Sequence, residues 1–167
     1  MNIDKLFLDN NFLHKEIDFF TTRKHIRKIT NNPELVASHI KKAKHNLSFF
    51  KLNKEYTEYN DWLIVTLYYA LYHTALALIT KKEYACKNHY ATILLLIKEY
   101  SISQQEIELI NNLSINKRDA ELYTNLKGDR HDASYSTETK FTKELINTYQ
   151  KEVLNFINKA EEIILNG

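Results

Sequence analysis

Apolar residues recur at steps of three and four positions along most of the chain, which is the spacing of an amphipathic helix. The clearest helix start is Asn32-Pro33-Glu34, where an asparagine suited to capping precedes a proline and an acidic residue. The apolar positions that follow form one stripe, made of Val36, Ile40, Ala43, Leu47 and Phe50. The pattern predicts a long helix that begins near residue 33 and buries this stripe.

The segment between Asp61 and Lys81 contains nineteen residues and no formal charge. A run of this kind approaches the length of a membrane-spanning helix. It also holds three threonines, three tyrosines and His73, and no second segment resembles it. A central helix that is buried on most sides explains the segment better than a membrane span.

Three further helices are indicated downstream. One covers roughly residues 87–100, and the next opens with the capping box Ser103-Gln104-Gln105-Glu106. The last helix is predicted to start near Ser136 or Thr137. Its continuous apolar stripe is formed by Phe141, Leu145, Tyr149, Val153, Phe156, Ala160 and Ile163.

The composition favours one all-α domain. Two glycines and one proline in 167 residues are too few for the turns of a sandwich or barrel. The length suffices for a single domain with its own core. We therefore predict a single up-and-down bundle of about five main helices over residues 32–167. Residues 1–31 are expected to form an N-terminal arm that is helical in part.

Several kinds of site are not expected. A lone Cys86 cannot form an intramolecular disulfide or a cysteine-rich zinc site, and a single cysteine near a helix start is usually inert. Two glycines cannot build a phosphate-binding loop. The histidines show no metal-ligand spacing, so neither a metal nor another cofactor is expected; they are His14, His25, His39, His45, His73, His89 and His131.

The charge pattern indicates a cytoplasmic protein. The first ten residues carry Asp4, Lys5 and Asp9, which does not fit a signal peptide. The net charge of +2 is too small to indicate nucleic-acid binding by itself. The densest basic run, residues 23–28, can bind a nucleic-acid backbone by releasing counterions. We favour the alternative, a solvated helical face.

Two places carry candidate chemistry. Tyr69 precedes His73 by four residues and shares its helix face, so the pair can line a polar pocket or form part of a hydrogen-bonded core. The second place follows Gly128, the only interior glycine. There Arg130 can stabilise charge on a phosphoryl group and His131 can move a proton, with Asp132 or Asp129 as its orienting partner. A polar turn in which Arg130 pairs with a carboxylate explains that segment equally well.

Three motifs resemble, in order and spacing, those of the HEPN family, and the resemblance covers about residues 33 to 165. The run Tyr68-Tyr69-Ala70-Leu71-Tyr72-His73 is similar to the family's Tyr-Tyr-Ala-x-Phe-His signature. Lys87-Asn88-His89 is similar to its Lys-Thr-His. The run Arg130-His131-Asp132-Ala133-Ser134-Tyr135 resembles its late Arg-x-x-Ala-Asp-Tyr element.

The resemblance implies a small helical bundle that often forms symmetric homodimers. Many members are paired with a minimal nucleotidyltransferase in toxin–antitoxin systems, and many are metal-independent ribonucleases. Their active motif is an arginine followed four to six residues later by a histidine, and dimerisation joins two such motifs in a cleft.

This chain departs from that motif at the final histidine. The corresponding positions hold Tyr135, Ser136 and Thr137. Tyrosine has a reference pKa of about 10, against about 6.5 for histidine, and is therefore a poorer base at neutral pH. A second Arg-x4-Tyr occurs at Arg118 and Tyr123, but the spacing from Arg130 to the last helix fits the family better.

The resemblance implies that the chain binds RNA or a nucleotide in a dimer cleft, in a toxin–antitoxin or related defence system. As an endoribonuclease it would use Arg130 on the phosphate, His131 for proton transfer and Tyr135 for stacking or hydrogen bonding. Further ligand contacts are expected from Tyr69, His73, His89 and Asp132. In the alternative, the bundle is a non-catalytic module that docks a nucleotidyltransferase and accepts a nucleotidyl group on Tyr135. A third interpretation is a small-ligand sensor at the His73 pocket.

Overall fold

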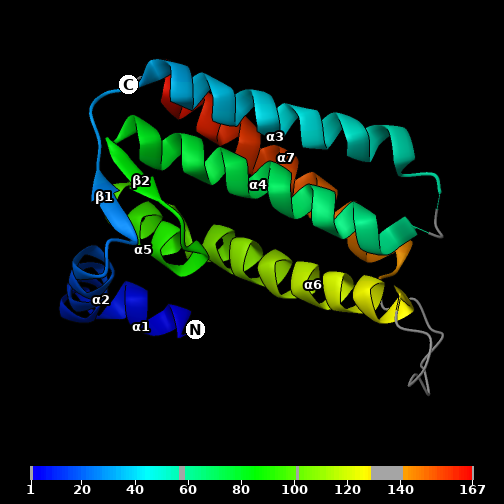
Figure 1. Cartoon of the computed structure of the whole chain (residues 1–167), viewed down its shortest axis with the longest axis horizontal. Helices are drawn as coiled ribbons and strands as arrows, with labels where there is room; N and C mark the ends of the chain where they lie inside the picture. Colours follow the sequence, from blue (N-terminus) through cyan, green and yellow to red (C-terminus); the bar gives the residue numbers. More distant parts are fainter. Residues whose placement is uncertain (1, 57–58, 101, 129–140, 167) are drawn as a thin grey trace.

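The computed structural model describes residues 2–56, 59–100, 102–128 and 141–166, with side chains described for all of these except 118–128. Within these ranges the chain forms seven helices and one two-stranded sheet (Figure 1). The helices are α1 (Ile3–Leu8), α2 (Asn10–Thr22), α3 (Pro33–Asn53), α4 (Asn60–Lys81), α5 (His89–Glu99), α6 (Gln104–Gly128) and α7 (Lys143–Asn166). The strands are β1 (Ile26–Lys28) and β2 (Tyr84–Cys86). The predicted all-α class is confirmed.

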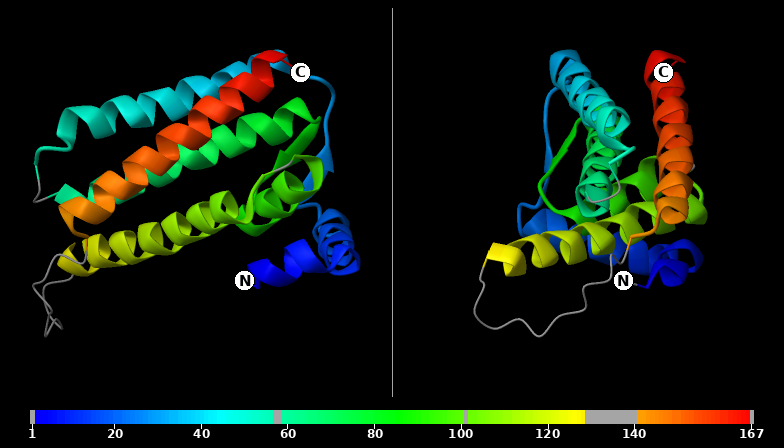
Figure 2. Two further views of the ribbon diagram at one scale, coloured as in Figure 1. Left: turned by 180° about the vertical axis from the view of Figure 1, so that it is seen from behind. Right: turned by 90° about the vertical axis from the view of Figure 1, so that its right-hand side faces the viewer.

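The four long helices α3, α4, α6 and α7 run in alternating directions along the long axis of the molecule (Figures 1 and 2). Helix α4 contacts each of the other three. The shorter α5 packs against α4 near the end of the bundle that holds the sheet, and α1 and α2 lie below it in Figure 1. This arrangement is the up-and-down bundle that the sequence predicts.

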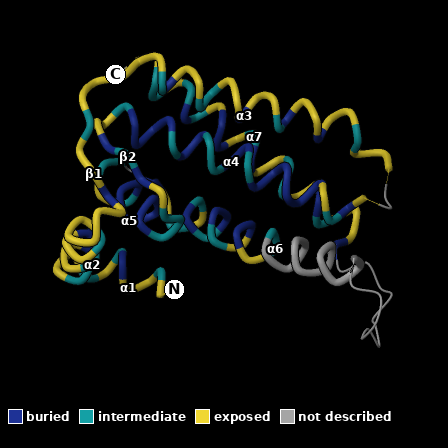
Figure 3. The backbone as a smooth tube through the Cα atoms, in the orientation of Figure 1, coloured by how far each residue is buried: buried dark blue, intermediate teal, exposed yellow. Residues whose placement is uncertain are grey.

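Helix α4 forms the centre of the core because its sequence leaves almost no polar face. Its side chains from Leu63 to Leu67 are all buried, and most of the next turns are buried as well (Figure 3). In the described part of the chain, α4 is the one helix long and apolar enough to cross a membrane. However, 72% of its most apolar 18-residue stretch is buried inside the protein. Such burial is consistent with the core helix of a soluble protein.

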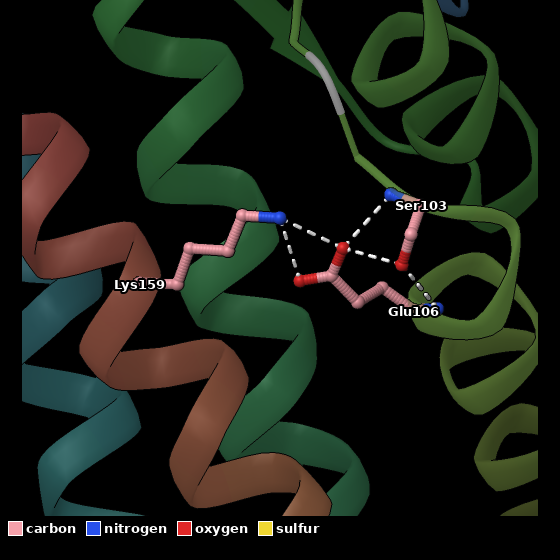
Figure 4. Close-up of polar contacts among 3 residues, drawn as sticks. All are labelled: Ser103, Glu106 and Lys159. Carbon is pink, nitrogen blue, oxygen red and sulfur yellow. Dashed lines mark hydrogen bonds and ion pairs between the residues drawn. The ribbon is translucent and has the colours of Figure 1, made fainter.

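Local sequence signals explain where α3 and α6 begin. Asn32 Oδ1 accepts a hydrogen bond of 2.9 Å from the backbone N–H of Leu35, and Pro33 occupies the first turn. Ser103 and Glu106 form the predicted capping box: the Ser103 N–H donates to Glu106 Oε2 at 2.8 Å, and the Glu106 N–H donates to Ser103 Oγ at 3.3 Å (Figure 4). Both helix starts agree with the sequence.

Helix α7 begins later than the sequence predicts. Its first residue is Lys143, whereas the predicted start lay near Ser136 or Thr137, which fall outside the described residues. Thr142 Oγ1 accepts a hydrogen bond from the Leu145 N–H and caps the helix. Phe141 precedes α7 and is nevertheless buried. It therefore packs in the core from the segment before the helix, and it does not belong to the apolar stripe of α7 as predicted.

The N-terminal segment contains a strand that the sequence analysis missed. Strand β1 pairs with β2 in antiparallel register, with Ile26 opposite Cys86 and Lys28 opposite Tyr84. The interpretation of residues 23–28 as a helical face is therefore wrong, because α2 ends at Thr22 and Lys24 turns the chain with a φ of 59°. Side chains of this segment join the same core as the bundle, namely Leu6, Leu13, Ile17 and Ile26.

Candidate functional site

The structure places only part of the predicted site. Tyr69, His73 and His89 are described, and they belong to one continuous group of aromatic rings. Arg130, His131, Asp132 and Tyr135 lie outside the described residues, as do the side chains of Arg118 and Tyr123.

Three tyrosines of α4 form the centre of this aromatic cluster. The rings of Tyr68 and Tyr72, one helical turn apart, are stacked at 9° with centroids 5.6 Å apart. Tyr69 meets Tyr68 edge-on at 5.2 Å. Such offset or edge-on pairs are the arrangements that aromatic rings prefer. The three rings therefore form one packed group along α4.

His89 joins the cluster from the first residue of α5. Asn88 fixes this start, because its Oδ1 accepts a hydrogen bond of 3.0 Å from the Ala91 N–H. The His89 ring lies 5.9 Å from Tyr68 and 6.0 Å from Tyr72 between centroids, and His89 Nδ1 is 3.5 Å from the Tyr68 hydroxyl oxygen. Helix capping thus positions a histidine against the tyrosines.

Lys117 of α6 brings a positive charge to the same cluster. Its Nζ lies 5.6 Å from the ring centroid of Tyr68 and 5.3 Å from that of Tyr69. Both distances fall within the range of a cation–π interaction. The sequence motifs do not include Lys117, because α6 lies between the second and the third motif. Only the packing of the helices shows which turn of α6 faces α4.

A pocket of about 480 Å³ opens where α4, α5 and α6 meet. Its size falls in the range of small-molecule sites. The lining combines rings, amide groups, a hydroxyl and an ammonium group: Tyr68, Asn88, His89, Tyr90, Asn111, Ser114, Ile115 and Lys117. Rings can stack on a base, amides can exchange hydrogen bonds with its edge, and the ammonium group can bind a phosphate.

His73 lies at the other end of the aromatic cluster and meets a histidine that the sequence analysis did not assign to a site. His73 Nδ1 is 3.1 Å from Nδ1 of His39 in α3. Burial lowers the pKa of both imidazoles, and the pKa of His73 is lowered further by His39 and Lys42. The lowered pKa values favour the neutral form of both rings.

Two other ionisable groups near the site stay protonated. Burial raises the pKa of the Tyr72 hydroxyl, which keeps it a hydrogen-bond donor. Burial also raises the pKa of the Cys86 thiol, whose Sγ donates to the Asn88 carbonyl at 3.3 Å. A nucleophilic thiolate at Cys86 is disfavoured on both grounds.

No protein-family model matches the chain, and no curated protein matches it.

Proposed function

We propose that this chain is a HEPN-type protein that binds RNA or a nucleotide at the pocket between α4, α5 and α6. The observation that carries the proposal is the convergence of Tyr68, His89 and Lys117 from three helices on one pocket. Tyr68 and His89 belong to two of the motifs that resemble the family. The presence of Tyr68 and His89 in one pocket supports the proposal that the two motifs contribute to a single site.

The pocket suits a ligand with both a base and a phosphate. Stacking of a base on an aromatic side chain contributes about 1–3 kcal/mol and tolerates any base. Lys117 supplies the positive charge that a phosphate needs, and its Nζ lies 5.6 Å from the ring centroid of Tyr68, which lines the same pocket. Asn88 and Asn111 add donors and acceptors for the base edge.

Arg130 belongs to the same proposal because it opens the run that resembles the family's late motif, and this run lies outside the described residues. In the proposal it binds a phosphate, while Tyr135 stacks or hydrogen-bonds. With Tyr135 in place of the motif's histidine, we expect binding without efficient RNA cleavage. A homodimer and a cytoplasmic toxin–antitoxin role belong to the same proposal.

The test is RNA binding by fluorescence anisotropy, using a labelled single-stranded RNA and metal-free buffer at several salt concentrations. We expect Lys117→Gln and Arg130→Ala each to weaken binding and to reduce the slope of log K against log salt by about 0.7. Lys151→Gln, an equal charge change on an exposed position of α7, should leave binding unchanged. Equal affinities in all three variants and the unmodified protein would remove this pocket from consideration.

Cleavage is tested separately by incubating the same RNA with the protein and with Arg130→Ala. Cleavage that is lost in Arg130→Ala would make the chain an endoribonuclease despite Tyr135. Equal activity in both would assign any cleavage to another site or to a contaminant.

A second candidate, docking of a nucleotidyltransferase partner, is favoured by a different observation. Large apolar side chains are exposed around the turn from α3 to α4, and clustered exposure of this kind marks interaction surfaces. They are Phe49, Leu52, Tyr56, Tyr59 and Trp62. Co-expression with a minimal nucleotidyltransferase, followed by mass spectrometry of Tyr135, tests this role. An unmodified Tyr135 and no co-purification would reject it.

A further inference from the structure

Positive charge is concentrated in two short segments that meet in the sheet. Residues 23–28 and 82–87 contain six basic residues and one acidic residue, which gives them a net charge of +5 against +2 for the whole chain. The two segments lie side by side because β1 pairs with β2 at one end of the bundle (Figure 1). We call them together the basic ribbon, and its cations are Arg23, Lys24, Arg27, Lys28, Lys82 and Lys87.

The cations of the basic ribbon are accessible and lack acidic partners. All six side chains are exposed. No ion pair within the described ranges involves any of them, because the carboxylates there pair with Lys44, Lys54, Lys98, Lys143 and Lys159. Clustered charges of one sign attract a ligand of the opposite sign. The basic ribbon therefore favours an extended anionic ligand.

Aromatic rings hold two of these cations at the surface. Lys28 Nζ lies 3.7 Å from the ring centroid of Tyr84, and it donates a hydrogen bond of 3.4 Å to the Lys82 carbonyl oxygen. The guanidinium carbon of Arg23 lies 4.1 Å from the ring centroid of Phe19. A cation–π contact restrains a side chain without neutralising its charge. Part of the ordering that a bound anion requires is therefore already present.

Arg27 lies on the outer face of the sheet. Its neighbour Ile26 is buried, and successive side chains of a strand point to opposite faces. The residue opposite Arg27 is Ala85, whose small side chain leaves the guanidinium group accessible. Lys87 follows two residues after Ala85, so the two cations lie diagonally across the ribbon. This arrangement suits successive phosphates of a strand better than one enclosed anion.

The basic ribbon leads directly to the pocket between α4, α5 and α6. Lys87 is followed in sequence by Asn88, His89 and Tyr90, and these three residues line the pocket. Proteins that bind single-stranded nucleic acid combine a positively charged track for the backbone with rings on which bases stack. The pocket supplies the rings and the ribbon supplies the track. Together they fit a strand of several nucleotides better than a free nucleotide.

We propose that the basic ribbon binds the phosphodiester backbone of a single-stranded RNA, one end of which occupies the pocket. The inference rests on the proposed function, and it narrows the ligand from RNA or a nucleotide to an RNA strand. Contacts to phosphates carry no direct sequence information, so the ribbon adds affinity and not base preference. A lipid surface fits less well, because binding to it also uses apolar side chains. Every exposed residue of the ribbon is charged or is His25.

The experiment is fluorescence anisotropy with the full-length protein and a labelled single-stranded RNA of about twelve nucleotides. The ribbon variant combines Arg27→Gln with Lys87→Gln. We expect it to raise the Kd by at least about tenfold at about 0.1 M salt and to reduce the slope of log K against log salt by about 1.4. The matched control combines Lys41→Gln with Lys51→Gln, which removes the same charge from exposed positions of α3 and should change neither value. Circular dichroism verifies that each variant is folded.

A ribbon variant that binds RNA as tightly as the control overturns the proposal, and the pocket then stands or falls by Lys117→Gln alone. Weakened binding in the ribbon variant with unchanged binding in Lys117→Gln would keep the ribbon and reject the pocket, so the two proposals can fail separately. Arg27→Lys preserves the charge and should bind RNA like the unmodified protein.

Co-sedimentation with vesicles of phosphatidylserine and phosphatidylcholine tests the alternative ligand. We expect no difference between the ribbon variant and its control in this assay. Vesicle binding that the ribbon variant loses, with RNA affinity unchanged, would assign the ribbon to a lipid surface and overturn the proposal.

Discussion

Lys159 of α7 binds Glu106 of α6 through both carboxylate oxygens, at 2.8 and 2.9 Å (Figure 4). The same Glu106 accepts hydrogen bonds from the Ser103 N–H at 2.8 Å and the Ser103 hydroxyl at 2.7 Å. One carboxylate therefore caps the start of α6 and holds α7 against it. This links a local sequence signal, the capping box, to the packing of the bundle.

We expect Glu106→Gln and Lys159→Gln each to lower the free energy of unfolding by about 1 kcal/mol, because Lys159 is 41% exposed and solvent screens part of the interaction. The double variant should lose less than the sum of the two, since both single changes remove the same contact. Urea unfolding of the four proteins measures this. Lys44→Gln, which breaks the more exposed pair with Glu161, serves as the control and should cost less. Strict additivity would show that the two residues are not coupled.

The same contact should make stability depend on acidic pH. Burial by itself would raise the pKa of Glu106, but the hydrogen bonds from Lys159 and Ser103 outweigh it and leave the pKa below the ordinary value of 4.5. A group whose pKa is depressed on folding contributes stability above its unfolded pKa and loses it as pH falls through its folded pKa. The stability difference between the protein and Glu106→Gln should therefore be present at about pH 7 and shrink toward about pH 3. A constant difference across this range in urea unfolding would contradict the assignment.

The elements that the sequence predicts well are those whose signals are local. The capping box at Ser103, the Asn32-Pro33 helix start and the uncharged run of α4 each act within a few residues or along one helix. Such signals depend little on the rest of the chain. They were sufficient for the helix order and for the central position of α4.

The features that the sequence did not predict depend on contacts between distant segments. Strands β1 and β2 have three residues each, too few to show an alternating pattern, and they exist because Ile26 and Cys86 meet across the fold. Likewise, the contacts of His39 with His73 and of Lys117 with Tyr69 arise only because α3 and α6 pack beside α4. The four-residue spacing and the resemblance both point to Tyr69 and His73, whereas only the resemblance points to His89.

The N-terminal segment should contribute to the stability of the bundle. Leu6 is 1% exposed and packs in the main core, whereas Leu8, two residues later in the same short helix, is 87% exposed. Leu6→Ala should lower the free energy of unfolding by about 2–5 kcal/mol, because it leaves a cavity. Leu8→Ala is the matched control and should change it by less than about 0.5 kcal/mol. Similar small effects of both changes in urea unfolding would show that residues 1–31 fold as an arm separate from the core.

Asn60 joins the start of α4 to the residues that precede α7. This side chain is buried, and its Nδ2 donates a hydrogen bond of 2.8 Å to the carbonyl oxygen of Phe141. Asn60→Asp keeps the shape of the side chain but replaces the donor with a carboxylate oxygen. An acidic residue suits the first turn of a helix, so helix preference alone predicts a small gain. We expect instead a loss of about 1–3 kcal/mol, because the Phe141 carbonyl is left without its partner and now faces a buried negative charge.

Urea unfolding at neutral pH measures this loss, with Asn112→Asp, an exposed position of α6, as the matched control. The loss at Asn60→Asp should also diminish at about pH 3, where a protonated carboxyl group can donate to the carbonyl again. A gain in stability at neutral pH would show that the dipole of α4 outweighs the contact with Phe141. A loss that is the same at both pH values would assign the effect to strain in packing, and the hydrogen bond would then contribute little to holding α7 in place.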